Sequence, residues 1–290
     1  MEAATATARP QARAPARAWA WLRRNALLIF AGLAILYMLA PILVIALFSF
    51  DAGNAQSELD FAFDGFTLEP WRHAFDVPDV NDSMLTSIEL ATLATVVSTA
   101  IGTLMALALV RYEFFGRRAT NLLIILPMAT PEIVIGAALL SMFVTYDVTT
   151  GFSTLFIAHV MFSISFVVVV VRSRLIGFDR SIEEAAADLG SPPFTTFRTV
   201  TLPLLAPGII AAALLAFALS IDDFVISNFN SGTTQTFPLY IFSASLRGIP
   251  VQVNVLATML FAVTVLAIAL VLWQQRRAEA MASVRPEQEV

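Results

Sequence analysis

Six long runs of hydrophobic residues follow one another along the chain, separated by shorter polar stretches. The runs cover about residues 26–50, 84–110, 121–146, 152–171, 205–229 and 251–273. Each is long enough to cross the ~30 Å hydrocarbon core of a bilayer as a helix. The first run is too long and too continuous for a secretory signal, so we interpret it as a retained anchor. The pattern predicts an all-α polytopic membrane protein with six transmembrane helices.

The basic residues predict how these helices are oriented. All seventeen are arginines, and fifteen lie before the first run, after the second and fourth runs, or after the sixth. Only Arg72 and Arg247 fall on the other side. Cytoplasmic segments of membrane proteins carry such an excess of positive charge. We therefore predict that both termini are cytoplasmic.

This orientation divides the chain into five predicted parts. They are a cytoplasmic tail (1–25), the first helix (26–50), a periplasmic loop (51–83), a core (84–275) with a cytoplasmic loop at 175–203, and a second tail (276–290). The arginines of the first tail suit contact with anionic lipid. The stretch "FTLEPWRHAF" in the periplasmic loop fits either a short amphipathic helix or a solvated loop. That loop is acidic, with Asp51, Glu58, Asp60, Asp64, Glu69, Asp76, Asp79 and Asp82.

The composition excludes several kinds of chemistry. Hydrophobic residues make up 58% of the chain and charged residues only 13%, against about 25% in an average soluble domain. The chain has no lysine, which a Walker A loop needs for ATP hydrolysis, and no cysteine for thiolate chemistry. Its two histidines, His73 and His159, are far apart, which disfavours a zinc site or a histidine-based triad. No long soluble domain is predicted, so a catalytic or binding domain would belong to another chain.

The most polar long stretch in the second half is "EEAAADLGSPPFTTFRTVTLPLL", residues 183–205. Ser181 and Glu184 are spaced as in a capping box, which predicts a helix that begins near residue 182. Gly190 stands where that helix needs a left-handed residue to end, and the Pro-Pro pair after it favours a second short helix. Pro203 and Pro207 mark the start of the fifth run. By its chemistry alone the loop fits either a connector packed under the bundle or a docking surface.

The spacing within this loop resembles a known signature. Glu184-Ala185-Ala186 is followed by three residues, Gly190, nine residues, Val200, one residue and Leu202-Pro203. This resembles the E-A-A-x3-G-x9-I-x-L-P signature of the permease subunits of ABC importers, with valine in place of isoleucine. The resemblance implies the MetI-like fold of type I, binding-protein-dependent importers. It also implies that the loop docks on an ATPase and that the coupling residues are Glu183, Glu184, Ala185, Ala186, Gly190, Leu202 and Pro203.

Further stretches extend the resemblance over residues 85–275. "LPMATPEIVIGAALLSMF" resembles the third span of these permeases, and "ALSIDDFVISNFNSG" resembles more narrowly the spermidine/putrescine branch. Leu85-Thr86-Ser87 departs from the Asn-Ser common at the start of the second span. The resemblance implies a non-catalytic subunit of the bacterial inner membrane, which binds no cofactor or nucleic acid while a partner binds ATP and Mg. The implied partners are an ATP-binding subunit dimer, a second permease subunit, a periplasmic substrate-binding protein and a small cationic substrate.

Three carboxylates fall within the hydrophobic runs. Glu132 follows Pro131 near the middle of the third run, and Asp222 and Asp223 lie in the outer half of the fifth. Carboxylates within spans are costly and usually face a bundle interior or an aqueous path. They are candidates for a cation path, and Tyr146, Phe224 and Phe229 could offer aromatic faces to an ammonium group.

Each carboxylate also has a structural interpretation. Thr130 could cap a helix that Pro131 opens, which would place Glu132 at the positive end of its dipole. Asp222 and Asp223 could instead form hydrogen bonds between helices and hold a gate. Adjacent helical residues point about 100° apart, so the two aspartates would not face the same spot.

Other functions remain open at this level. A permease for a different solute, such as a metal, an anion or an opine, would share the docking loop. An ion-coupled secondary transporter would need no ATPase, but no inverted repeat is recognisable in the sequence. A membrane-embedded enzyme has the least support, because no nucleophile accompanies the acids.

Overall fold

The computed structural model describes residues 14–52, 63–177, 179–246 and 248–283. The described residues are helical apart from turns, short connecting loops and one isolated antiparallel bridge between Asp51 and Phe66. The chain divides into two compact units, Phe75–Ile249 and the combination of Met1–Ala74 with Pro250–Val290. The predicted all-helical class is therefore confirmed for the part of the chain that the structure describes.

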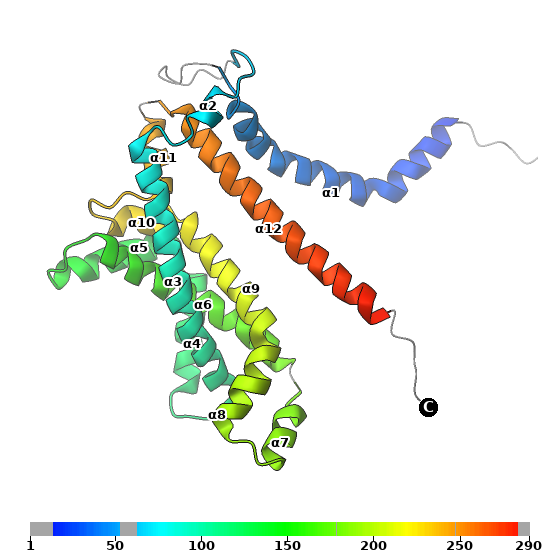
Figure 1. Ribbon diagram of the computed structural model, residues 1–290, viewed down its shortest axis with the longest axis vertical. Helices are drawn as coiled ribbons and strands as arrows, with labels where there is room; N and C mark the ends of the chain where they lie inside the picture. Colours follow the sequence, from blue (N-terminus) through cyan, green and yellow to red (C-terminus); the bar gives the residue numbers. More distant parts are fainter. Residues whose placement is uncertain (1–13, 53–62, 178, 247, 284–290) are drawn as a thin grey trace, which may run out of the picture. The chain divides into compact units, whose positions relative to one another are not determined.

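Three long helices form the centre of the unit Phe75–Ile249. They are α3 (Pro78–Arg111), α6 (Phe152–Ile176) and α9 (Leu202–Ile221), and each packs against the other two (Figure 1). Small residues on the buried side of α3 allow close approach, as in helix pairs within membranes. The core between the three helices contains Ala106, Leu109, Val167, Val168, Val171, Leu205, Ala212 and Ala216.

Gly102 marks the closest approach of α3 to α6. A Cβ atom built on Gly102 would lie 2.6 Å from Val167 Cγ1 and 3.3 Å from the backbone oxygen of Ile164. We expect Gly102→Val to push the helices apart and to destabilise the protein by about 1–3 kcal/mol or more, the usual cost of overpacking. The melting temperature in detergent measures this. Gly32→Val is the matched control, since a Cβ on Gly32 meets nothing within 4 Å; equal melting temperatures for the two variants would contradict the expectation.

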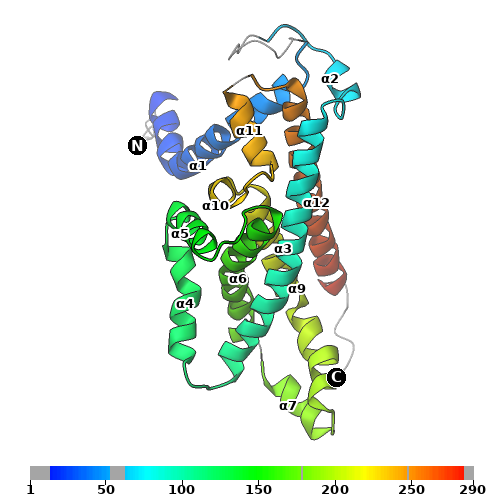
Figure 2. The ribbon, with the colours of Figure 1, turned by 90° about the vertical axis from the view of Figure 1, so that its left-hand side faces the viewer.

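Shorter helices complete this unit. They are α4 (Arg117–Ala129), α5 (Glu132–Thr145), α7 (Ser181–Asp188), α8 (Pro193–Thr196), α10 (Val225–Asn230) and α11 (Phe237–Ser245). A π-helical turn, Phe197–Thr201, joins α8 to α9 without a break. Helices α7 and α8 lie together at one end of α9, whereas α5 and α10 pack against each other farther along the unit (Figures 1 and 2).

The other unit contains α1 (Ala14–Phe48), α2 (Glu69–Arg72) and α12 (Val251–Ser283). Between Arg23 and Phe48, α1 is strongly apolar and almost entirely exposed, as expected of a helix surrounded by lipid or partner helices. After α1, Phe50 stacks on Phe66 and Trp71. The amphipathic helix considered for "FTLEPWRHAF" is present as the single turn α2. Glu58, Asp60 and the tail arginines Arg9 and Arg13 lie outside the described residues.

Within the described part of the chain, four helical stretches are long and apolar enough to cross a membrane: Arg23–Phe48, Pro78–Arg111, Phe152–Ile176 and Pro193–Ile221. The pair α4 and α5 would make a fifth span if it is counted as one bent segment. The apolar part of α12, Val251–Leu266, is shorter than these spans. The structure thus describes a multi-pass membrane protein with four or five candidate spans, compared with the six predicted.

Two predicted spans differ from the observed helices. The third, predicted over 121–146 with a new helical segment opening at Pro131, is bent by 112° between α4 and α5. The fifth, predicted over 205–229, begins at Pro193 and ends at Ile221. Pro131, which lacks an N–H group, explains the first break, since a proline there cannot donate to the preceding turn. The second break has no proline and depends on the side chain of Asp223.

Candidate functional site: two interrupted helices and a polar loop

The bend between α4 and α5 exposes Glu132 as the first residue of α5. Figure 2 shows the sharp change in direction between the two helices. Thr130 does not cap α5 as considered from the sequence, because its hydroxyl donates backwards to the oxygen of Leu126 at 2.7 Å. Pro131 occupies the N-cap position instead, so α5 begins without a side-chain cap. The negative charge of Glu132 suits the positive end of this helix.

The two aspartates at the break between α9 and α10 lie in different environments. Asp222 is exposed at the end of α9, whereas Asp223 is buried. The carboxylate of Asp223 accepts hydrogen bonds from the backbone N–H groups of Ile226 and Ser227, at 3.2 and 2.8 Å. It therefore caps α10. The expectation that the two aspartates point about 100° apart assumed a continuous helix, and it does not apply because Asp222 and Asp223 lie between α9 and α10.

Helices α5 and α10 bring the two breaks close together. A Cβ atom on Gly136 would lie 2.9 Å from the ring of Phe229, so only a glycine fits this contact. Asn230 donates to the backbone oxygen of Gly136 at 3.3 Å. Glu132 consequently lies near enough to Asp222 and Asp223 for their charges to act on it. The structure thus brings Glu132 near the adjacent residues Asp222 and Asp223, although 90 positions or more separate them in the sequence.

A buried polar cluster that the sequence analysis did not identify supports this arrangement. His159 of α6 places its Nδ1 atom 2.7 Å from the Ser220 hydroxyl and its Nε2 atom 3.0 Å from that of Ser227. Nε2 also lies 3.5 Å from a carboxylate oxygen of Asp223. These side chains are almost completely buried, so they hold α6, α9 and α10 together rather than present a nucleophile. A histidine in the middle of an apolar run was the signal that could have revealed the cluster.

The aromatic candidates are not brought to one place. Tyr146 ends α5, at the opposite end from Glu132, which is about 20 Å away along a helix of this length. Its side chain is 74% exposed. Phe224 directly follows the two aspartates, and its ring centroid lies 4.8 Å from that of Phe242 in α11. Phe224 therefore lies at the break and Tyr146 does not.

The polar loop contains α7, a turn and the start of α8. Gly190 has a φ of +80°, and the N–H of Ser191 donates to the oxygen of Ala186 at 3.1 Å. This is the left-handed ending that the sequence predicts. The predicted capping box is absent, since α7 begins at Ser181 and the N–H of that residue donates to the Asp179 carboxylate. The second predicted short helix is the first turn of the long stretch Pro193–Ile221.

The candidate coupling residues differ in exposure. Glu184 and Ala185 are exposed and Ala186 is half-buried, while Gly190, Leu202 and Pro203 are exposed. Apolar side chains lie beside them in solvent, with Leu189 89% and Phe194 74% exposed. Glu183 is the exception, since it is buried against Arg111 and Thr201.

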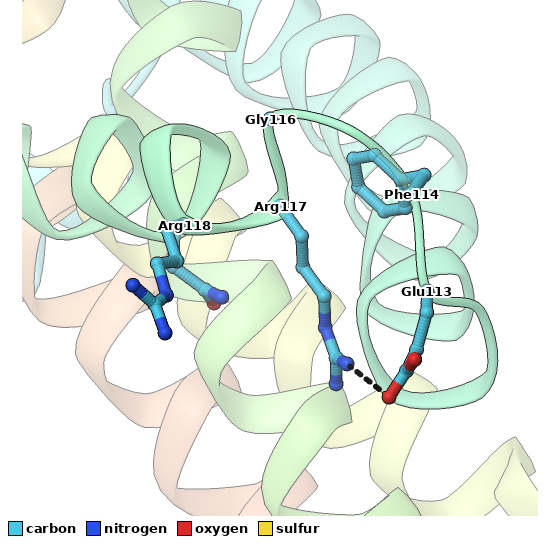
Figure 3. A pocket seen from close by; sticks show the side chains of 6 residues that line it. Glu113, Phe114, Gly116, Arg117 and Arg118 are labelled. Carbon is cyan, nitrogen blue, oxygen red and sulfur yellow. Dashed lines mark ion pairs between the residues drawn. The ribbon is translucent and has the colours of Figure 1, made fainter.

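An open pocket of about 580 Å³ lies at the loop between α3 and α4. Figure 3 shows that Arg117 reaches back across this loop towards Glu113, at 3.9 Å, while Arg118 points away. Asn121, also in the lining, accepts a hydrogen bond from Arg172 of α6. The pocket is basic and contains none of the three clustered carboxylates. Among the described residues, no group of His, Cys, Asp and Glu could hold a metal ion.

The chain is similar in sequence to several proteins that are named as permeases of transport systems. The chain is 36% identical to the spermidine/putrescine transport system permease protein PotC of Haemophilus influenzae, over 82% of this chain and 91% of that protein. It is 34% identical to the putrescine transport system permease protein PotI of Escherichia coli, over 80% of this chain and 84% of that protein.

Solved structures share the fold. A bacterial ABC transporter involved in the import of the acidic polysaccharide alginate matches with a TM-score of 0.62 and 17% identity, over 92% of this chain and 99% of that one.

Residues 98–280 match the family described as the inner membrane component of binding-protein-dependent transport systems. This region contains both helix breaks and the whole polar loop. The chain therefore belongs to the family of binding-protein-dependent transport system inner membrane components.

Proposed function

We propose that this chain is the permease subunit of an ATP-driven ABC importer that carries polyamines across the bacterial inner membrane. The observation that carries the proposal is the meeting of two interrupted helices, each with a carboxylate exposed at its break. Transporters commonly place substrate sites at such discontinuous helices. Putrescine and spermidine are flexible ammonium compounds, and relatives named for their transport are 34–36% identical to this chain.

The exposed carboxylates Glu132 and Asp222 would contact the passing ammonium groups. Asp223 would influence the cation only through its charge and without direct contact, because its oxygens already accept hydrogen bonds from the N-terminal turn of α10. Phe224 lies at the break, where an aromatic face would add a cation–π contact. Tyr146 would lie at a different level of the path, since it stands at the far end of α5.

The polar loop would dock on the ATPase. Glu184 and Ala185, with the exposed apolar residues Leu189 and Phe194, form a surface that combines small, acidic and hydrophobic groups. Gly190 fixes the turn after α7, and Leu202 and Pro203 begin the helix through which movement of the loop would reach the membrane. Nucleotide binding and hydrolysis, with ATP and Mg, would belong to the partner, and this chain would bind no cofactor.

The remaining subunits follow from this assignment. A dimer of ATP-binding subunits, a second permease subunit and a periplasmic substrate-binding protein would complete the importer. With α4–α5 and α12 each counted as one span, the chain would cross the membrane six times in the MetI-like arrangement. Both termini would then be cytoplasmic, as the distribution of arginines predicts. Residues 51–83 would form the periplasmic loop and 84–275 the permease core.

Uptake of labelled putrescine and spermidine by cells that express the complete system tests the proposal. We expect ATP-dependent uptake by the wild type and a loss of about tenfold in Asp222→Asn and in Glu132→Gln, equivalent to ~1.4 kcal/mol of lost interaction with the cation. Asp147→Asn is the matched control, because Asp147 is an exposed carboxylate at the far end of α5 whose φ of +52° asparagine tolerates. Wild-type cells that take up neither compound would overturn the polyamine assignment. Normal uptake in both path variants would overturn the proposed path.

A further inference from the structure

Glu183 has a different environment from the other residues of the polar loop. It lies in the first turn of α7, next to Glu184, yet its side chain points inward and is buried. The guanidinium of Arg111 donates to both carboxylate oxygens, with Nη2 at 2.6 Å from Oε1. The hydroxyl of Thr201 donates to Oε1 as well. We call Arg111, Glu183 and Thr201 the Glu183 clamp.

The clamp joins three separate elements. Arg111 is the last residue of α3, Glu183 belongs to α7, and Thr201 is the last residue of the π-helical turn that precedes α9. A bidentate pair between arginine and a carboxylate is directional as well as strong, so it fixes orientation in addition to distance. The loop helix is therefore attached at one point to the ends of two of the three central helices.

The charge state of Glu183 is consistent with a permanent attachment. Burial by itself raises the pKa of Glu183, but the hydrogen bonds from Arg111 and Thr201 and the charges of Arg111 and Arg180 outweigh it. The pKa of Glu183 consequently lies below its ordinary value of 4.5. The carboxylate stays ionised at neutral pH, and the clamp would be lost only as the pH falls through this lowered value.

We propose that Glu183 is a positioning residue, which transmits movement of the docked loop to α3 and α9, rather than a residue that contacts the ATPase. The inference rests on the proposed function and changes the role of Glu183 within it. Glu184 faces outward to the partner, and Glu183 faces inward to the membrane helices. A displacement of α7 moves α3 and α9 with it only while the clamp is closed.

Transport and ATP hydrolysis by the reconstituted importer separate the two roles. In Glu183→Gln and Arg111→Leu we expect the ATPase to co-purify as with the wild type and to hydrolyse ATP. Uptake in proteoliposomes should fall by about tenfold, a typical size for coupling between two sites. The double variant Arg111→Glu/Glu183→Arg restores the pair with its charges exchanged and should recover most of the uptake. Asp188→Asn, an exposed carboxylate on the same helix, is the matched control.

Loss of the ATPase from the purified Glu183→Gln complex would overturn the inference in favour of direct docking. Unchanged uptake in both single variants would also overturn it.

A second measurement does not depend on the substrate. The chain has no cysteine, so spin labels can be attached at Tyr112→Cys beside α3 and at Asp188→Cys in α7, both of which are exposed sites. The distance distribution between the labels in the assembled importer should broaden when Glu183→Gln is added. Equal distributions would contradict the clamp itself. If the wild type fails to transport polyamines while this broadening is seen, the proposed substrate fails and the clamp stands.

Discussion

Glu184→Arg is expected to abolish ATP-driven uptake while the subunit remains in the membrane. Glu184 lies in the first turn of α7 and is exposed, and no contact within the described residues uses its carboxylate for folding. Its replacement should therefore leave the helices intact. A reversed charge on a docking surface places like charges or unpaired groups against the partner, which costs several kcal/mol. We expect uptake to fall by about a hundredfold or more.

The matched control for this substitution is Glu113→Arg. Glu113 is an exposed carboxylate in the loop between α3 and α4, and its pair with Arg117 is long, at 3.9 Å. Both variants reverse the charge of an exposed glutamate outside the long helices, but only Glu184→Arg alters the polar loop. Membrane content by immunoblot, co-purification of the ATPase and polyamine uptake are the three readouts. Uptake at the wild-type rate in Glu184→Arg would exclude this residue from the docking surface.

Asp223→Ala is expected to destabilise the protein more than any other substitution at the two breaks. The alanine would leave the N–H groups of Ile226 and Ser227 without their acceptor and remove the carboxylate beside His159. Each buried donor left without a partner costs about 1–3 kcal/mol. Helix α10 would lose its cap and one of its contacts with α6, so the contact with α5 should loosen as well.

The melting temperature of the purified subunit in detergent checks this expectation. Asp222→Ala is the matched control, because it removes the same group one residue earlier from an exposed position. Asp223→Asn should fall between the two, since its amide oxygen can still accept one of the N–H groups. If Asp223→Ala melted together with Asp222→Ala, the cap on α10 would not contribute to the stability of this break.

The sequence predicted the helical class, the candidate spans before and after the polar loop, and the left-handed turn at Gly190. Each of these depends on neighbouring residues only. A run of apolar side chains has to be helical in a membrane, because its backbone groups find no other partners there. A helix followed by glycine ends in a left-handed turn for equally local reasons. The capping box at Ser181 failed because a second local acceptor, Asp179, competes for the same N–H.

The sequence also placed Glu132 next to a proline that interrupts its helix, and it singled out Asp222 and Asp223. It treated the two aspartates as neighbours on a continuous helix, because no proline or glycine announces the end of α9 at Ile221. That break exists because Asp223 turns back to cap α10 and meets His159, which is 64 positions earlier in the chain. A contact of this kind leaves no pattern in the residues around it.

The amino-acid sequence by itself therefore indicated most of the helical segments and the loop at which we propose that a partner docks, since hydrophobic length, turn chemistry and motif spacing act over a few residues. The tertiary structure alone decided which polar groups are free to act. It buried Glu183 against Arg111, 72 positions away, and left Glu184 in solvent. It also buried Asp223 as the cap of α10, while Asp222 and Glu132 stayed exposed. The burial of a side chain depends on the helices packed against it, and these come from distant parts of the chain.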